Sequence, residues 1–317
     1  MMPGNIRPLR LFLFILIAAG IACSGPAYAS AFPAEGGDAL LDTYHRIEAK
    51  LLHSSFGVPL YLESLDSHHT IRIDTYGIFD YPFEEVRAEL ESPSAWCDIV
   101  SLHINVKGCI HGIQNGIREL TVYSGKKFET FSPDMRRTKY RYRIAASAPR
   151  YLDICLTADK GPFSTKNLLI RFEAIPVGAG RTFVHFICSY DYGFWTGIVM
   201  KSYFSTIGSG RAGFTVVGTD DNGEPVYVSG LQGAFERNAI RSYLAIQAYM
   251  DTRGVPEGAR FEKRINRWYD LTSRYPKQLS DMEKERYLSL KRQERKDRMI
   301  LQGRDKSNEH ARPEGES

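Results

Sequence analysis

The chain has 317 residues, of which 43% are hydrophobic and 25% are charged. This length and composition indicate one large domain or two small ones with a full apolar core. The formal net charge of +4 is too small to indicate nucleic acid as a partner.

The first 29 residues have the pattern of a secretory signal peptide. Arg7 and Arg10 give a positive start, and an apolar run from 11 to 22 follows. A small-x-small cleavage site occupies 27–29. We therefore expect cleavage before Ser30 and a mature protein that is periplasmic or secreted.

Two alternatives for this leader remain open. It could act as an uncleaved membrane anchor, although its apolar run is shorter than a membrane span. Cys23 also allows acylation as a lipoprotein, but Gly20 stands where such signals usually carry a branched apolar residue. The sequence favours the cleaved, unanchored form over both.

Residues 30–67 precede the main domain. Within them, the apolar residues of 37–52 recur at helical spacing and predict a helix. Residues 53–69 are predicted to be a loop. Residues 70–79 alternate between apolar and polar side chains, which predicts a half-buried strand.

The next stretch, 81–100, reads YPFEEVRAELESPSAWCDIV. Pro82 suits the first position of a helix, because its missing N–H would be unpaired there anyway. Pro93 ends that helix, and another short helical segment follows. The stretch therefore predicts two short helices in succession.

Strand patterns then repeat, separated by turn residues. Their alternating side chains indicate antiparallel strands with one face on the core and the other facing water. The expected strands are 102–111, 117–124, 139–147, 151–158, 167–176 and 181–192.

An insertion at 195–229 interrupts this rhythm, and its second half predicts a hairpin that turns at Asn222-Gly223. The longest helix pattern of the domain follows at 231–251. Residues 253–300 predict a basic helical extension. Residues 301–317 are polar and are expected to be a disordered tail.

This order of elements resembles the helix-grip fold of the START-related (SRPBCC) superfamily, which includes lipid-transfer domains and polyketide cyclase-like proteins. The resemblance covers roughly 68–252 and lies in the strand, the short helix pair and the long helix. In that superfamily the first short helix often reads Pro-x-x-x-Val-x-x-x-Leu, followed by Pro and Trp. The matching residues here are Pro82, Val86, Leu90, Pro93 and Trp96.

The fold class that the resemblance implies is α+β. A curved antiparallel sheet of about seven strands would wrap on the long C-terminal helix, with the short helices plugging one end. The helices before and after 68–252 would be extra to the fold. The insertion at 195–229 departs from the usual pattern and is expected to cover the mouth of a cavity.

The resemblance also implies a hollow between sheet and helix that holds an apolar ligand. Such pockets are mostly apolar with a few placed polar groups, and tyrosine supplies both. The expected cavity residues are Tyr140, Tyr142, Ile154, Ile170, Phe172, Phe186, Tyr190, Phe235 and Tyr243. The alternative is that these side chains simply fill the core.

The cysteines beyond the leader predict one disulfide. Cys155 and Cys188 lie on strands separated by a third strand, which places them roughly 9–10 Å apart. A disulfide needs Cα atoms within about 7 Å, so this pair should stay apart. Cys97 and Cys109 lie at the end of the second short helix and on the next strand, and we predict that they bond.

No metal site or catalytic group is expected. His103, Cys109 and His111 share one strand face, but the sequence has no CxxC pair or HExxH helix to support a zinc site. His185 and Asp191 face away from the cavity and lie about 20 Å apart, which is too far for a catalytic dyad. They are expected to be surface residues or contacts to flanking helices.

No cofactor is expected either. Gly208, Gly210 and Gly213 match GxGxxG, but a dinucleotide-binding fingerprint needs a strand before it and a helix after it. Here a helix-like segment precedes the glycines and a strand-like segment follows, so the order is reversed.

The favoured function is non-catalytic binding or transport of a hydrophobic small molecule or lipid in the bacterial periplasm. One alternative is a cavity enzyme of the cyclase or hydrolase type. The other is an envelope structural or interaction protein, with the basic C-terminal region in peripheral contact with a partner or an anionic membrane.

Overall fold

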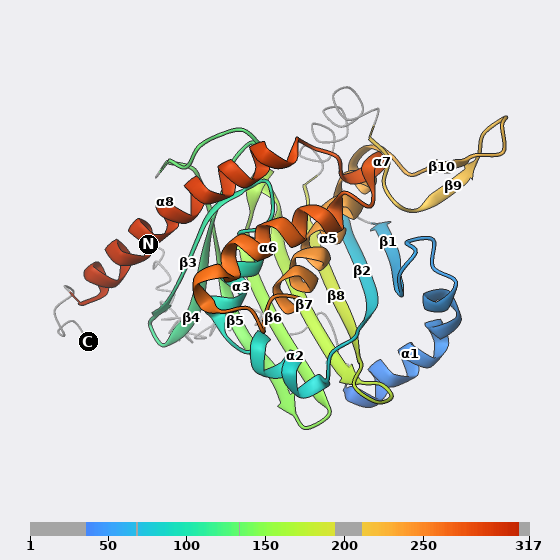
Figure 1. Cartoon of the computed structure of the whole chain (residues 1–317), viewed down its shortest axis with the longest axis horizontal. Coiled ribbons are helices and arrows are strands. Elements are labelled where there is room, and N and C mark those ends of the chain that lie inside the picture. Colours follow the sequence, from blue (N-terminus) through green and yellow to red (C-terminus); the bar gives the residue numbers. More distant parts are fainter. Residues whose placement is uncertain (1–35, 68, 133, 194–210, 311–317) are drawn as a thin grey trace, which may run out of the picture. The chain divides into compact units, whose positions relative to one another are not determined.

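The computed structural model describes residues 36–67, 69–132, 134–193 and 211–310 (Figure 1). The expected signal peptide and the first part of the insertion at 195–229 lie outside these ranges. No helix within them is both long and apolar enough to span a membrane.

The fold is built on one antiparallel sheet of eight strands, in the order β1-β2-β8-β7-β6-β5-β4-β3. Strand β2 pairs with β8, so the last strand of the sheet returns to lie beside an early one. The strands are β1 (Leu60–Ser67), β2 (Thr70–Phe79), β3 (Val106–Gln114), β4 (Ile117–Ser124), β5 (Arg136–Ala148), β6 (Tyr151–Lys160), β7 (Lys166–Pro176) and β8 (Thr182–Asp191).

Strand β1 corrects the prediction of a loop at 53–69. It pairs with β2 along its whole length, through a tight turn in which His69 has a φ of 67°. Leu60 and Leu62 are buried, but Leu65 is 59% exposed, so the alternation lapses in the second half. The alternation of apolar and polar residues in β1 is therefore too weak to predict a strand, and its hydrogen bonds to β2 hold it in the sheet.

Two short helices follow β2, as expected. Ser92 caps the second of them by accepting a hydrogen bond from the Ser94 N–H. The Trp96 ring N–H donates to the Leu90 carbonyl at 2.9 Å and ties the two helices together. They are α2 (Phe83–Leu90) and α3 (Pro93–Val100).

The long helix α5 (Gly230–Met250) lies across one face of the sheet and contacts β1, β2 and β8 (Figure 1). It comes very close at Gly77 on β2, where an added Cβ atom would lie 1.9 Å from the Tyr243 hydroxyl oxygen. An antiparallel sheet gripping one long helix is the arrangement that the sequence predicts, and the helix-grip fold is confirmed.

Helix α1 (Gly37–Leu52) packs on the opposite face of the sheet. Its apolar stripe forms a separate cluster with outward-facing side chains of β2, β7 and β8. The cluster members are Leu40, Tyr44, Ile47, Leu51, Tyr76, Ile175, Val177 and Phe183.

The C-terminal extension consists of α6 (Glu257–Thr272), α7 (Pro276–Leu279) and α8 (Lys284–His310). Trp268 on α6 and Tyr287 on α8 stack with ring centroids 4.9 Å apart and belong to the same apolar core as α5.

Helix α8 corrects the expectation of a disordered tail from 301, because it continues to His310. Its anchor is Gln302, whose side-chain amide donates to the His111 carbonyl and accepts from the His111 N–H on β3. Residues 311–317 lie outside the described ranges.

Two smaller elements complete the described chain. A short 3₁₀ turn occupies Pro162–Ser164. Strands β9 (Val216–Thr219) and β10 (Pro225–Tyr227) form the expected hairpin, in which Gly223 adopts a φ of 81°. Glycine accepts this conformation without steric cost.

The predicted disulfide is present. Cys97 on α3 and Cys109 on β3 are bonded, with their Cα atoms 5.2 Å apart. Cys155 and Cys188 are free thiols, on strands separated by β7. A crosslink over so short a loop stabilises the fold by about 3 kcal/mol.

Candidate ligand-binding site

The residues expected to line the cavity fall into two groups. Five of them are at most 4% exposed and belong to the apolar core, namely Tyr142, Ile154, Phe172, Phe186 and Tyr243. The other four keep accessible surface although they pack against the same core, namely Tyr140, Ile170, Tyr190 and Phe235. The predicted cavity residues are therefore fully packed in one part of the space between sheet and α5, and partly accessible to solvent in another.

The accessible part lies between the sheet and the N-terminal half of α5. The rings of Phe235 on α5 and Tyr190 on β8 pack edge to face, with their centroids 4.6 Å apart. The side of α5 that carries Phe235 therefore faces the sheet. Asn238 and Ser242 follow at helical spacing and are also half-buried. Cys188, which pairs with Ile170, is half-buried as well.

These half-buried side chains border the part of the interior in which the sequence predicts a hollow. Each of them keeps part of its surface accessible to a water-sized probe. The C-terminal half of α5 differs, because Tyr243, Ile246 and Met250 are buried at 3% exposure or less. The partly accessible side chains of the grip thus lie toward the N-terminal half of α5.

Two tyrosines, Tyr140 and Tyr190, lie in this part of the interior. The Tyr190 hydroxyl is buried and has no hydrogen-bond partner within the described part of the chain. Burial raises the pKa of both Tyr140 and Tyr190, which keeps the hydroxyls protonated and able to donate. A buried polar group without a partner is unusual and can be satisfied by a ligand or a water molecule.

A polar cluster lies next to Asn238 on α5. The Arg241 guanidinium, 3% exposed, contacts Asn238 Oδ1 at 3.4 Å and pairs with Asp281, while its Nε has no partner within the described ranges. Burial, with the Arg241 and Lys291 charges, lowers the pKa of His103 to about 3, so this imidazole is neutral.

Asp281 is the one acidic group among three cations. Besides Arg241 it pairs with Lys127 and with Arg211 at 2.6 Å. These charges outweigh the effect of burial and hold the pKa of Asp281 at about 2. The cluster keeps an excess of positive charge beside the hollow.

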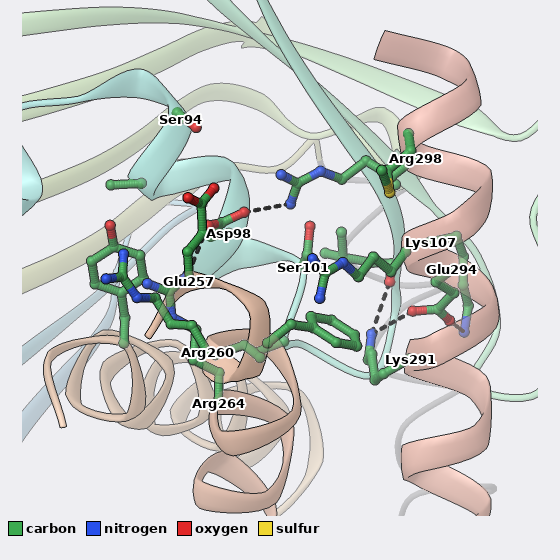
Figure 2. A pocket seen from close by; sticks show the side chains of 18 of the residues that line it. Ser94, Asp98, Ser101, Lys107, Glu257, Arg260, Arg264, Lys291, Glu294 and Arg298 are labelled. Atoms are coloured by element: carbon green, nitrogen blue, oxygen red, sulfur yellow. Dashed lines mark hydrogen bonds and ion pairs between the residues drawn. The ribbon is translucent and has the colours of Figure 1, made fainter. Parts of the chain in front are cut away.

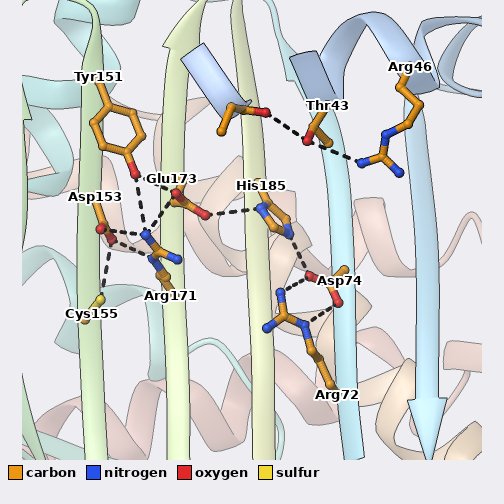
Figure 3. A network of polar contacts seen from close by, with 11 residues as sticks. Thr43, Arg46, Arg72, Asp74, Tyr151, Asp153, Cys155, Arg171, Glu173 and His185 are labelled. Carbon is orange, nitrogen blue, oxygen red and sulfur yellow. Dashed lines mark hydrogen bonds and ion pairs between the residues drawn. The ribbon is translucent and has the colours of Figure 1, made fainter. Parts of the chain in front are cut away.

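A second polar network, on the outer face of the sheet, was missed by sequence reasoning (Figure 3). His185 Nε2 lies 2.7 Å from Asp74 Oδ1, and His185 Nδ1 lies 3.2 Å from Glu173 Oε2, close but not aligned as a hydrogen bond. Arg171 pairs with Glu173 at 3.1 Å and with Asp153 through two 2.9 Å contacts.

This outer network links neighbouring strands of the sheet, and we assign it a structural role. Arg72 adds two 2.7 Å contacts to Asp74, so the carboxylates and cations balance when His185 is protonated. The network links β2, β8, β7 and β6, as Figure 3 shows, and none of its members faces α5. The outward position expected for His185 is confirmed, but it is buried and not on the surface.

The remaining sequence candidates do not assemble into a reactive group. Cys109 is bonded to Cys97, which removes its thiolate from any set with His103 and His111. Asp191 accepts hydrogen bonds from the Thr70 hydroxyl and the Asn167 amide.

No protein-family model matches the sequence, and no curated protein matches it. The similar solved structures include human StAR-related lipid transfer protein 5, at 11% identity over 68% of this chain and 96% of that one, with a TM-score of 0.35. A conserved protein of unknown function from Enterococcus faecalis is 10% identical over 71% and 95% of the two chains, with a TM-score of 0.33.

A third similar structure is the Zhui aromatase/cyclase from a Streptomyces species, at 10% identity over 63% of this chain and 94% of that one, with a TM-score of 0.29. Similarity at this level carries no argument about activity. The helix-grip fold of this chain stands on its own strand order and on the position of α5 across the sheet.

Proposed function

We propose that this protein binds a hydrophobic small molecule or lipid between the sheet and the N-terminal half of α5, without chemical reaction. The observation that carries the proposal is the half-buried aromatic set around the Tyr190 hydroxyl, which has no hydrogen-bond partner among the residues that the structure describes. Aromatic walls offer an apolar ligand a large contact area, and a few polar groups fix its orientation.

The surroundings of the hollow also restrict the ligand. Its walls include Tyr140, Ile170 and Phe235, whereas Asn238 and Arg241 lie toward the excess positive charge around Asp281. This asymmetry suits an elongated molecule with an apolar body and one polar end. A periplasmic or secreted location, which the leader predicts, completes the proposal as a carrier in the cell envelope.

A binding experiment tests the proposal. The purified, disulfide-bonded protein is titrated with a fluorescent NBD-labelled fatty acid and an NBD-labelled sterol, and a solvent extract of the same protein is analysed by mass spectrometry. We expect saturable binding of at least one probe or a co-purified apolar molecule. The absence of both results would contradict the proposal.

Two matched substitutions on α5 locate the site. Ser242→Phe places a ring in the hollow and should weaken probe binding by about tenfold or more, because the ligand loses the occupied volume. Gln247→Phe adds the same ring to the same helix at a position outside the Phe235–Asn238–Ser242 face and should leave binding within about twofold. Equal binding by both variants would place the ligand elsewhere.

A further inference from the structure

A separate pocket of about 460 Å³ lies outside the grip, where α3, α6 and α8 meet the start of β3 (Figure 2). Ser94 and Asp98 line it from α3, and Ser101 lines it from the residue that caps the end of this helix. Arg260 comes from α6 and Arg298 from α8, as Figure 2 shows. Its volume falls within the range of small-molecule sites.

The pocket is rich in uncompensated positive charge. Its lining contains the basic residues Lys107, Arg260, Arg264, Lys291, Arg295 and Arg298. The acidic residues of the lining are Asp98, Glu257 and Glu294. The basic groups therefore outnumber the acidic ones by two to one.

At its deep end, two ammonium groups share one carboxylate. Glu294 lies 3.0 Å from Lys107 Nζ and 2.7 Å from Lys291 Nζ, and the two lysines are 1% and 3% exposed. Their other hydrogen bonds go to main-chain carbonyl groups. Burial, with the nearby Lys107, lowers the pKa of Lys291 to about 8, as expected for a cation that lacks full compensation.

A second carboxylate of the lining is also shared by two cations. Asp98 is shared by Arg264 at 2.7 Å and Arg298 at 2.6 Å. Arg260 donates only to main-chain carbonyls, and Arg295 lies over the Phe261 ring at 4.3 Å. Within the described ranges, neither of these two guanidinium groups pairs with a carboxylate.

We propose that this pocket binds a small organic molecule that carries a phosphate monoester. Guanidinium groups are frequent partners of phosphate oxygens, and a dianion offsets most of the excess charge. Lys107 and Lys291 contribute charge alone, because all three N–H donors of each are already used. Ser94 adds a hydroxyl donor, while Leu102 and Phe261 offer an apolar wall for the organic part. The Ser101 hydroxyl already donates to the Cys97 carbonyl, so it can only accept. The site is distinct from the hollow beside α5 and does not depend on it.

Phenyl phosphate is the test probe, because it combines a phosphate monoester with a small apolar body. Isothermal titration of the full mature chain should show saturable binding of phenyl phosphate and none of phenol. Binding should weaken as salt rises, since the attraction is between charges. No binding of phenyl phosphate at millimolar concentration would overturn the proposal.

Substitutions assign the binding to the pocket. The double variant Arg260→Gln/Arg295→Gln removes two cations that pair with no carboxylate in the described part of the chain, so the fold should persist while affinity falls by about tenfold or more. Arg292→Gln is the matched control, since Arg292 lies on α8 outside the lining and pairs with Glu262 on the surface. Equal loss in both variants, or no loss in the double variant, would refute the assignment.

Two sources of the phosphate can be separated. Vesicles of phosphatidylcholine with and without phosphatidic acid present the same monoester as a lipid head group. Binding to phosphatidic acid vesicles that the double variant loses identifies a lipid source. Binding to soluble phenyl phosphate alone identifies a free phosphorylated molecule. Binding to neither phosphatidic acid vesicles nor phenyl phosphate would contradict the proposal.

Discussion

His185 shows how one buried side chain can couple stability to pH. Burial by itself would lower the pKa of His185, but the contacts with Asp74 and Glu173 outweigh it, and the pKa is raised. Arg72 and Arg171 lie on the far side of those carboxylates, and Tyr76 stacks on the imidazole at 4.3 Å. The protonated form is therefore the one that the fold stabilises.

The sign of the pH effect follows from that raised pKa. The stabilisation is fully present below the pKa of an unfolded histidine, about 6.5, and is lost as pH rises through the folded value. We expect the free energy of unfolding, from urea titrations at a series of pH values, to decline above about pH 6.5. The variant His185→Gln should lack this decline. A parallel decline in the variant would show that another group causes it.

The position of a single residue could be predicted from the sequence where it depends on the alternation or spacing of strands. Strand parity correctly placed His185 opposite Phe186, and strand spacing correctly kept Cys155 and Cys188 apart. The network around His185 was not predictable, because Asp74 lies more than a hundred positions earlier in the chain and meets it only through the pairing of β2 with β8.

At the level of elements, the contact between α5 and β2 depends on a missing side chain. An added Cβ atom at Gly77 would lie 1.9 Å from the Tyr243 hydroxyl oxygen and 2.7 Å from the ring carbon that bears it. The tyrosine is 3% exposed and is packed within the apolar core. Gly77→Ala should therefore lower the free energy of unfolding by about 1–3 kcal/mol.

A double-mutant cycle tests this contact. Tyr243→Phe removes the oxygen atom that clashes first, so Gly77→Ala should cost less in that background than in the wild type. Chemical denaturation of the four proteins gives the coupling energy. Additive effects of the two changes would show that the glycine is required for another reason.

Elements were predictable where their patterns are regular. The apolar stripes of α1, α2 and α5 and the alternation of β2 and β5 are regular, and the structure confirms these elements. Edge strand β1 was missed because only Leu60 and Leu62 are buried along it. The last turns of α8 were missed because their sequence is polar, and the hydrogen bonds between Gln302 and His111 that hold them lie outside any local pattern.

For the whole molecule, the C-terminal helices are part of the core and not an attachment to it. The sequence places residues 253–300 outside the helix-grip domain. In the structure, however, Ile265, Trp268 and Tyr287 are at most 2% exposed and share one apolar cluster with α5. The Trp268 ring N–H also donates to the Arg241 carbonyl at 3.0 Å. Removal of these helices would expose one side of α5 to water.

Truncation should therefore separate two parts of the C-terminal region. A chain that ends after residue 253 loses these large apolar contacts, each worth roughly 1.5–3 kcal/mol, which together are comparable to the usual stability of a domain. It should show no cooperative thermal unfolding. A chain that ends after Gly303 keeps the Gln302 contacts with β3 and should unfold within about 5 °C of the full protein. Cooperative unfolding of the chain that ends after residue 253 would contradict this prediction. It would show that residues up to 253 fold alone and that α6 to α8 pack onto them as a separate unit.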